Sequence, residues 1–151
     1  MNYIGVDPGK KGGLAVIRDD ETVEAVPFSE SEYLRIASSL AGDTMAVVED
    51  VHAMPKQGTK SMFSFGYNKG FICGLLYALK VRVQLISPNR WKRHFSLDSD
   101  KSRSISCAQR LFPSVSLYAS PRCRVPHDGI AEALIMAEYC RRICNQGKSH
   151  T

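Results

Sequence analysis

Short apolar runs separated by polar turns open the chain. The run Tyr3–Asp7 is apolar until its last residue, an acid, which is typical of a short buried strand. The Gly-rich segment "PGKKGG" predicts a turn, and "LAVIR" and "TVEAV", joined by the polar turn "DDE", predict two further strands. The chain is therefore expected to begin with three antiparallel strands.

The rest of the chain alternates between helical and strand patterns. We expect helices at 29–40, 61–79 and 101–112, and a last helix from about Pro126 to Cys144. The strands "MAVVED" and "RVQLI" lie between them, and "SPNRWK" leads into a short helix. Hairpins followed by alternating strands and helices predict one α/β domain with a mixed sheet. We assign residues 1–145 to this domain and 146–151 to a short, disordered tail.

The helix expected at 61–79 carries three glycines at a spacing of four, Gly66, Gly70 and Gly74. Each glycine inside a helix costs about 1 kcal/mol relative to alanine. Three on one face indicate that another backbone approaches closely there. That backbone belongs either to the protein's own sheet or to a partner subunit.

Composition places the chain among soluble globular proteins, with 44% hydrophobic and 23% charged residues. The sequence contains no apolar run long enough to span a membrane, and the start "MNYIGVDPG" has no signal-peptide pattern. Five cysteines without CxxC spacing favour a reducing cytoplasm, and an organellar location stays open. Residues 1–80 hold 8 Lys/Arg and 10 Asp/Glu, whereas residues 81–151 hold 12 and 5. The basic second half suggests a polyanionic partner, although a merely soluble surface explains it equally well.

Acidic residues stand where strands end and where the last helix begins. Asp7 ends the first strand, Glu49 ends the fourth, and Asp128 and Glu132 lie four residues apart on the last helix. At ~4 Å two like charges repel by about 4 kcal/mol at an effective dielectric of 20, so a cluster of four acids needs a counter-charge. Two Mg²⁺ ions would supply it and would suit phosphodiester hydrolysis. The alternative is that these acids are solvated or favoured by the helix dipole.

Five ordered blocks resemble the RuvC-like Holliday junction resolvases, most closely the branch found in phages and bacteria. The blocks are "IGVDPGKKGGLAVI", "VVEDVHAMPKQGTKSMFSFGYNKGFICGLL", "SPNRWKRHF", "DKSRSISCAQRLFP" and "HDGIAEALIMAEY". The plant chloroplast resolvase is similar in its W-K-x-x-F, L-F-P and A-E-A-L signatures. The resemblance covers residues 3 to about 140.

The resemblance implies a ribonuclease H-like fold, a five-stranded mixed sheet flanked by helices. It implies a homodimer that makes paired symmetrical nicks in a four-way DNA junction and leaves 5′-phosphate and 3′-hydroxyl ends. It implies two Mg²⁺ per active site, with Mn²⁺ as a substitute, and neither a membrane nor a nucleotide cofactor.

The family's acids fall on Asp7, Glu49 and Glu132. The fourth ligand falls on Asp128 or on the adjacent His127, and we choose Asp128. The resemblance places Lys101 near the scissile phosphate, as an electrostatic helper in catalysis.

Basic and aromatic residues around these blocks are candidates for DNA contacts. Aromatic rings can stack on bases and cations can neutralise phosphates. The candidates are His52, Lys56, Lys60, Phe65, Lys69, Arg90, Lys92, Arg93, Arg122 and Arg124. Phe63, Phe65 and Tyr67 could instead be core or dimer contacts, and Trp91 is expected to be a buried anchor. Relatives place an aromatic wedge at the position of His52, and they form their dimer through the helix that here carries Gly66, Gly70 and Gly74.

Other functions compete with this interpretation. "GVDPGKKGG" could be the phosphate loop of an actin-like nucleotide-binding phosphotransferase, although such folds usually need two similar domains. A non-catalytic junction-binding module would share the basic patch without needing the four acids. A ribonuclease H-like nuclease could also act on RNA or on other branched DNA.

Overall fold

A five-stranded mixed sheet forms the centre of the computed structural model, which describes residues 1–52 and 58–148. The strand order is β3-β2-β1-β4-β5. The strands are β1 (Asn2–Asp7), β2 (Gly13–Ile17), β3 (Val23–Pro27), β4 (Thr44–Glu49) and β5 (Arg82–Ile86). The helices are α1 (Glu30–Ser39), α2 (Thr59–Ala78), α3 (Pro88–His94), α4 (Lys101–Leu111) and α5 (Asp128–Lys148).

The direction of the strands confirms the predicted sheet. β1 pairs antiparallel with β2, and β2 pairs antiparallel with β3. β1 pairs parallel with β4, and β4 pairs parallel with β5. Because β1 and β4 are parallel neighbours, their acidic C-terminal residues end at the same edge of the sheet.

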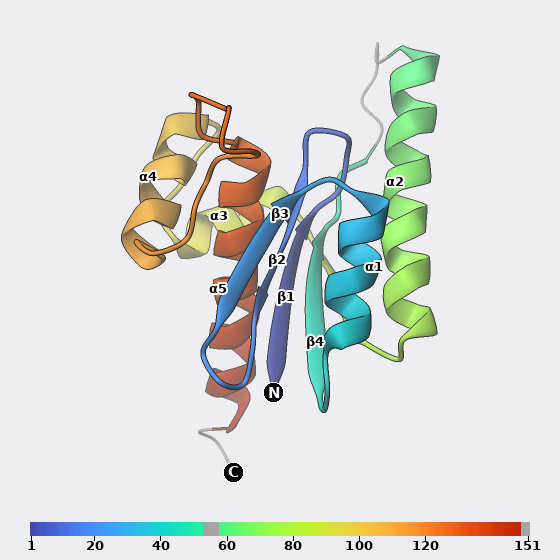
Figure 1. Ribbon diagram of the computed structural model, residues 1–151, viewed down its shortest axis with the longest axis vertical. Helices are drawn as coiled ribbons and strands as arrows, with labels where there is room; N and C mark the ends of the chain where they lie inside the picture. Colours follow the sequence, from blue (N-terminus) through green and yellow to red (C-terminus); the bar gives the residue numbers. More distant parts are fainter. Residues whose placement is uncertain (53–57, 149–151) are drawn as a thin grey trace.

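Helices cover both faces of the sheet, α1 and α2 on one side and α3, α4 and α5 on the other (Figure 1). Side chains of a strand alternate between the two faces. Tyr3 accordingly packs in the core beneath α5, whereas Ile4 and Val6 pack beneath α1 and α2. No helix in the described part of the chain is long and apolar enough to cross a membrane.

Helix α5 is the most deeply buried helix, and every residue from Gly129 to Cys140 is buried. It begins at Asp128 rather than at Pro126, because His127 caps it: its Nδ1 accepts a hydrogen bond from the backbone N–H of Ile130 at 3.2 Å. It also extends beyond the expected end near Cys144, so that residues 146–148 of the predicted tail are helical. The residues after Lys148 lie outside the described part.

The glycine face of α2 is open in this chain. A Cβ atom added at Gly66, Gly70 or Gly74 would meet no atom within 4 Å. The first of the two explanations for these glycines, close packing on the protein's own sheet, is therefore wrong. Phe63 and Tyr67 are also solvent-exposed, with 78% and 57% of their surface accessible.

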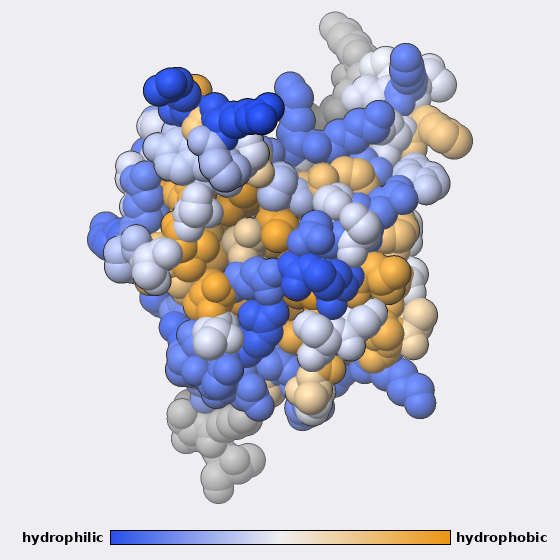
Figure 2. Space-filling view, in the orientation of Figure 1, coloured by the Kyte–Doolittle hydropathy of each residue, from blue (hydrophilic) through white to orange (hydrophobic). Residues whose placement is uncertain are grey.

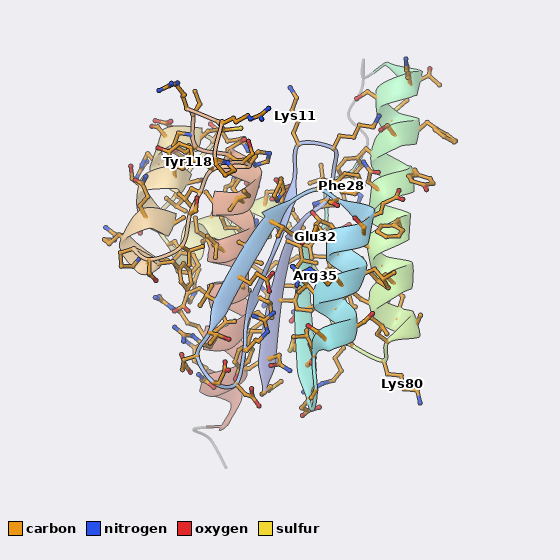
Figure 3. The ribbon with its side chains drawn as sticks, viewed as in Figure 1. Lys11, Phe28, Glu32, Arg35, Lys80 and Tyr118 are labelled. Carbon is orange, nitrogen blue, oxygen red and sulfur yellow. The ribbon has the colours of Figure 1, made fainter. Side chains whose placement is uncertain are left out.

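A hydrophilic band crosses the face formed by α1 and the edge strand β3 (Figure 2). Arg35 forms ion pairs with Glu24 and Glu32, and Arg18 forms a second ion pair with Glu24. Figure 3 shows Glu32 and Arg35 near one another on this face. Two cations and two anions balance there, so this band does not attract a polyanion.

Candidate active site

Asp7 and Glu49 lie side by side at the C-terminal edge of two parallel strands. Val6 of β1 is paired in register with Val48 of β4, and each acid is the next residue of its strand. Neighbouring strands are about 4.8 Å apart, and residues in register point to the same face. The sheet therefore brings these two carboxylates together, as the sequence predicted from the strand ends. Ligands of open α/β sheets commonly bind at this edge.

Close backbone packing brings the first turns of α5 to the same edge. A Cβ atom on Gly129 would lie 2.3 Å from the carbonyl oxygen of Lys11. A Cβ atom on Gly13 would lie 2.8 Å from the carbonyl oxygen of Gly129. Only glycine allows such an approach, so the helix rests directly on the β1–β2 turn. Asp128 and Glu132, on either side of this contact, consequently approach Asp7.

Glu132 is held between two lysines. Lys101 Nζ, at the first residue of α4, lies 2.9 Å from Glu132 Oε2 and 3.3 Å from Asp128 Oδ2. Lys92 Nζ lies 3.4 Å from Glu132 Oε1, to which Ser104 Oγ also donates a hydrogen bond at 3.4 Å. Glu132 is 2% exposed, and a buried carboxylate requires such partners.

Trp91 fixes Glu49. Its indole Nε1 donates a buried hydrogen bond of 2.9 Å to Glu49 Oε1. Trp91 is the buried anchor that the sequence indicated, but this polar contact was not foreseen. The next residue, Lys92, was predicted to contact DNA; it is instead only 16% exposed and is engaged with Glu132. One short helix, α3, therefore supplies a partner to two of the four acids.

Burial and mutual repulsion perturb the acids of the cluster. Desolvation by burial, then the charges of Glu49 and Glu132, raise the pKa of Asp7 well above its usual range. Burial also raises the pKa of Glu49, and the hydrogen bond from Trp91 opposes this effect. Burial works to lower the pKa of Lys101, but its contacts with Glu132 and Asp128 outweigh burial and raise that pKa. These directions indicate that the four acids act electrostatically as one cluster.

The donor set fits a hard divalent cation, with one rearrangement. All four candidate ligands are carboxylates, the ligands that Mg²⁺ prefers. Within 1–52 and 58–148, however, no three Asp, Glu, His or Cys side chains already form a ready metal-binding group. The ammonium of Lys101 instead lies against Asp128 and Glu132. His127 accepts a hydrogen bond at its Nδ1 from the first turn of α5, whereas Asp128 contacts Lys101 beside Glu132.

A groove of about 780 Å³ opens onto the cluster. Its lining includes the acids Asp7 and Asp128 and the basic residues Lys10, Lys11, Lys60 and Lys101, together with Phe65. Lys60 and Phe65 were predicted to contact DNA, whereas Lys10 and Lys11 were missed. Their signal is the pair of lysines in "PGKKGG", directly after the first acid. Figure 3 shows Lys11 projecting from the β1–β2 turn at the open end of the sheet.

The other predicted DNA contacts are distributed unevenly. Lys69 is partly buried and forms an ion pair with Asp50, so it is not available to a phosphate. The side chain of His52 is 82% exposed and lies 3.5 Å from Asp50. The four arginines among the predicted contacts, Arg90, Arg93, Arg122 and Arg124, are all exposed. Lys56 lies outside the described residues.

The comparisons with known proteins agree with this architecture. No family model matches the sequence, and no curated protein does. Thermus thermophilus RuvC, solved in complex with a Holliday junction substrate, matches 97% of this chain and 96% of its own, with a TM-score of 0.63 and 19% identity. A second Thermus thermophilus RuvC structure matches 94% and 96%, with a TM-score of 0.61 and 19% identity. The chain therefore has the ribonuclease H-like fold of the RuvC Holliday junction resolvases, which confirms the fold predicted from its motifs.

Proposed function

We propose that this chain is a metal-dependent endonuclease that resolves four-way DNA junctions by paired symmetrical nicks. The observation that carries the proposal is the convergence of Asp7, Glu49, Asp128 and Glu132 at the end of a groove with four lysines. The acids suit a metal centre, and the lysines suit a phosphate backbone. The RuvC structure that contains a Holliday junction supports the choice of substrate.

The acids would hold two Mg²⁺ ions. Asp7 would be the central ligand, because the charges of all three other acids raise its pKa. Glu49 and Glu132 would each hold one ion, and Asp128 would complete the oxygen ligands. Ions bound there would lower the pKa of water and offset charge on the leaving oxygen of the phosphodiester, with Mn²⁺ as a substitute.

The protein's own side chains would position the substrate. Lys10, Lys11 and Lys60 line the groove and would neutralise successive phosphates. Phe65 lines the same groove and would stack on an unpaired base. Hydrolysis by this route needs no covalent nucleophile and leaves 5′-phosphate and 3′-hydroxyl ends.

A homodimer would set two such sites at a fixed spacing across a junction. We propose the open face of α2 as the contact, because Gly66, Gly70 and Gly74 allow a second backbone to approach. Exposed Phe63 and Tyr67 on the same helix would add apolar area. Gly70→Leu should convert a dimer to a monomer in light scattering, with Lys80→Gln as a surface control.

The function is tested by cleavage of a mobile four-way junction, compared with cleavage of a Y-fork, a linear duplex and an RNA–DNA hybrid. Hydrolysis of ATP is measured beside them, and every assay is run with and without Mg²⁺. We expect paired nicks in the junction only, and only with the metal. Asp7→Asn and Glu132→Gln should abolish cleavage while gel-shift binding of the junction persists. Normal cleavage by either variant would refute the assignment of the acids.

The groove is tested separately through the salt dependence of junction binding. Lys10→Gln and Lys11→Gln should each reduce the slope of log Kd against log salt by about 1. Lys80→Gln is a matched control, because Lys80 lies at the opposite end of the molecule (Figure 3). An equal effect of all three substitutions would mean that binding is not localised to the groove.

A further inference from the structure

Both oxygens of Glu132 are already occupied by cationic groups. Oε2 lies 2.9 Å from Lys101 Nζ, and Oε1 lies 3.4 Å from Lys92 Nζ. The Lys101 ammonium also contacts Asp128 at 3.3 Å. A divalent cation that binds Glu132 and Asp128 together must therefore take the position of the Lys101 ammonium.

The two lysines differ in how firmly they are held. The Lys92 side chain is 16% exposed, and its ammonium lies 5.2 Å from the ring centre of Trp91. The Lys101 side chain is 51% exposed and lines the groove. Glu132 is buried in both pairs, but Lys101 is exposed and Lys92 is enclosed, so water solvates a released Lys101 ammonium and its release costs less. Lys101 is thus the lysine that can leave.

The charge count leads to the same residue. Four carboxylates carry four negative charges, and the two lysines offset two of them. One divalent ion neutralises the remainder, but a second leaves two excess positive charges, which the departure of one ammonium and the arrival of one phosphate together remove. Lys101 stands between the acids and the groove, so its movement meets both needs.

We propose that Lys101 is a displaceable counter-ion: a divalent cation takes its place at Asp128 and Glu132, and the released ammonium turns into the groove and binds a DNA phosphate. The second half of this inference rests on the proposed function, and the first half does not. Metal binding and DNA binding are then coupled through one side chain, and the coupling is reciprocal.

Chemical labelling of the unmodified protein tests the displacement. Lysines are acylated with a trace of acetic anhydride, and the yield at each lysine is measured by mass spectrometry. An ammonium held by two carboxylates reacts slowly. Lys101 labelling should therefore be slow in EDTA, several-fold faster with Mn²⁺, and slow again when a short linear duplex is added to the Mn²⁺ form. Lys60 lines the groove and has no carboxylate partner among the described residues, so its labelling should respond to the duplex alone.

A calorimetric measurement gives an independent answer. Lys101→Met keeps the apolar stem and removes the charge, and we expect it to bind Mn²⁺ about fivefold more tightly than the wild type. Lys101→Arg keeps the charge in a stronger, forked pair, and should bind Mn²⁺ more weakly than the wild type. Lys80→Met, at the opposite end of the molecule (Figure 3), should leave Mn²⁺ affinity unchanged.

The outcomes separate this inference from the proposed function. Unchanged Lys101 labelling on addition of Mn²⁺, or equal Mn²⁺ affinity of the wild type and both Lys101 variants, would overturn the displacement. Faster labelling with Mn²⁺ that the duplex does not reverse would overturn the phosphate contact. Neither measurement requires cleavage, so an enzyme inactive on junctions would still give a clear result.

Discussion

Asp7→Asn is expected to stabilise the metal-free protein while it removes a proposed metal ligand. Asp7 is partly buried beside Glu49, and burial, Glu49 and Glu132 all raise the pKa of its carboxyl group. The asparagine side chain has nearly the same shape and no charge. The substitution therefore relieves repulsion in the cluster, and we expect a higher melting temperature in EDTA at neutral pH.

The size of this effect follows from the sheet geometry. Asp7 and Glu49 stand at equivalent positions of neighbouring strands, about 4.8 Å apart. At that separation two like charges repel by about 3 kcal/mol at an effective dielectric of 20. The Lys101 ammonium and solvent at the exposed side reduce this, and we expect a net gain of about 1–2 kcal/mol. For a chain of this length the gain corresponds to roughly 3–6 °C in melting temperature.

The pH dependence gives the sign of the effect. Because the pKa of Asp7 is raised in the folded state, folded protein binds this proton more tightly than unfolded protein does. The wild type therefore loses stability as pH rises from about 4, the usual carboxyl range, through the raised pKa. The gain in folding stability from Asp7→Asn should vanish below the usual carboxyl pKa range and reach its full size above the raised pKa of Asp7.

The assay is thermal unfolding in EDTA and in excess Mg²⁺ over a range of pH. In Mg²⁺ the order should reverse, because only the wild type gains stability from the bound ion. Asp19→Asn is the matched control, since Asp19 is exposed and follows the end of β2 opposite the cluster. If Asp7→Asn lowered the melting temperature in EDTA at neutral pH while Asp19→Asn did not, the reasoning about repulsion would be refuted.

Two further predictions concern the close contacts of glycines and the hydrogen bond from Trp91 to Glu49. Gly5→Ala should destabilise the fold by about 3 kcal/mol, because the added Cβ would lie 2.2 Å from the backbone of α5. Gly70→Ala, on the open face of α2, should stabilise the monomer by up to about 1 kcal/mol, because alanine favours the helix and its Cβ meets no atom. Urea unfolding at low protein concentration compares the two, and equal effects would contradict the packing described. Trp91→Phe should cost about 1–3 kcal/mol, since Glu49 loses a buried hydrogen bond, and should weaken Mn²⁺ binding in calorimetry. Unaltered Mn²⁺ affinity would mean that Trp91 does not position Glu49 for a metal.

The sequence by itself predicted the sheet, and it placed four acids where two strands end and where the last helix begins. Apolar runs ending in Asp7 and Glu49 have the length of buried strands, and acids at the ends of two parallel strands meet at one edge when the strands are neighbours, as β1 and β4 are. The quoted motifs then pointed to the fold that RuvC also has. These properties are local or follow from chain order, so a single sequence carries them.

Only the tertiary structure decided how the lysines divide between the acids and the groove. Lys69 and Lys92 looked like phosphate contacts, yet they pair with Asp50 and Glu132. A lysine has a long, flexible stem, so the partner of its ammonium depends on which elements pack nearby rather than on its neighbours in the chain. The hydrogen bond from Trp91 to Glu49, between residues 42 positions apart, likewise exists only because α3 packs against the end of β4.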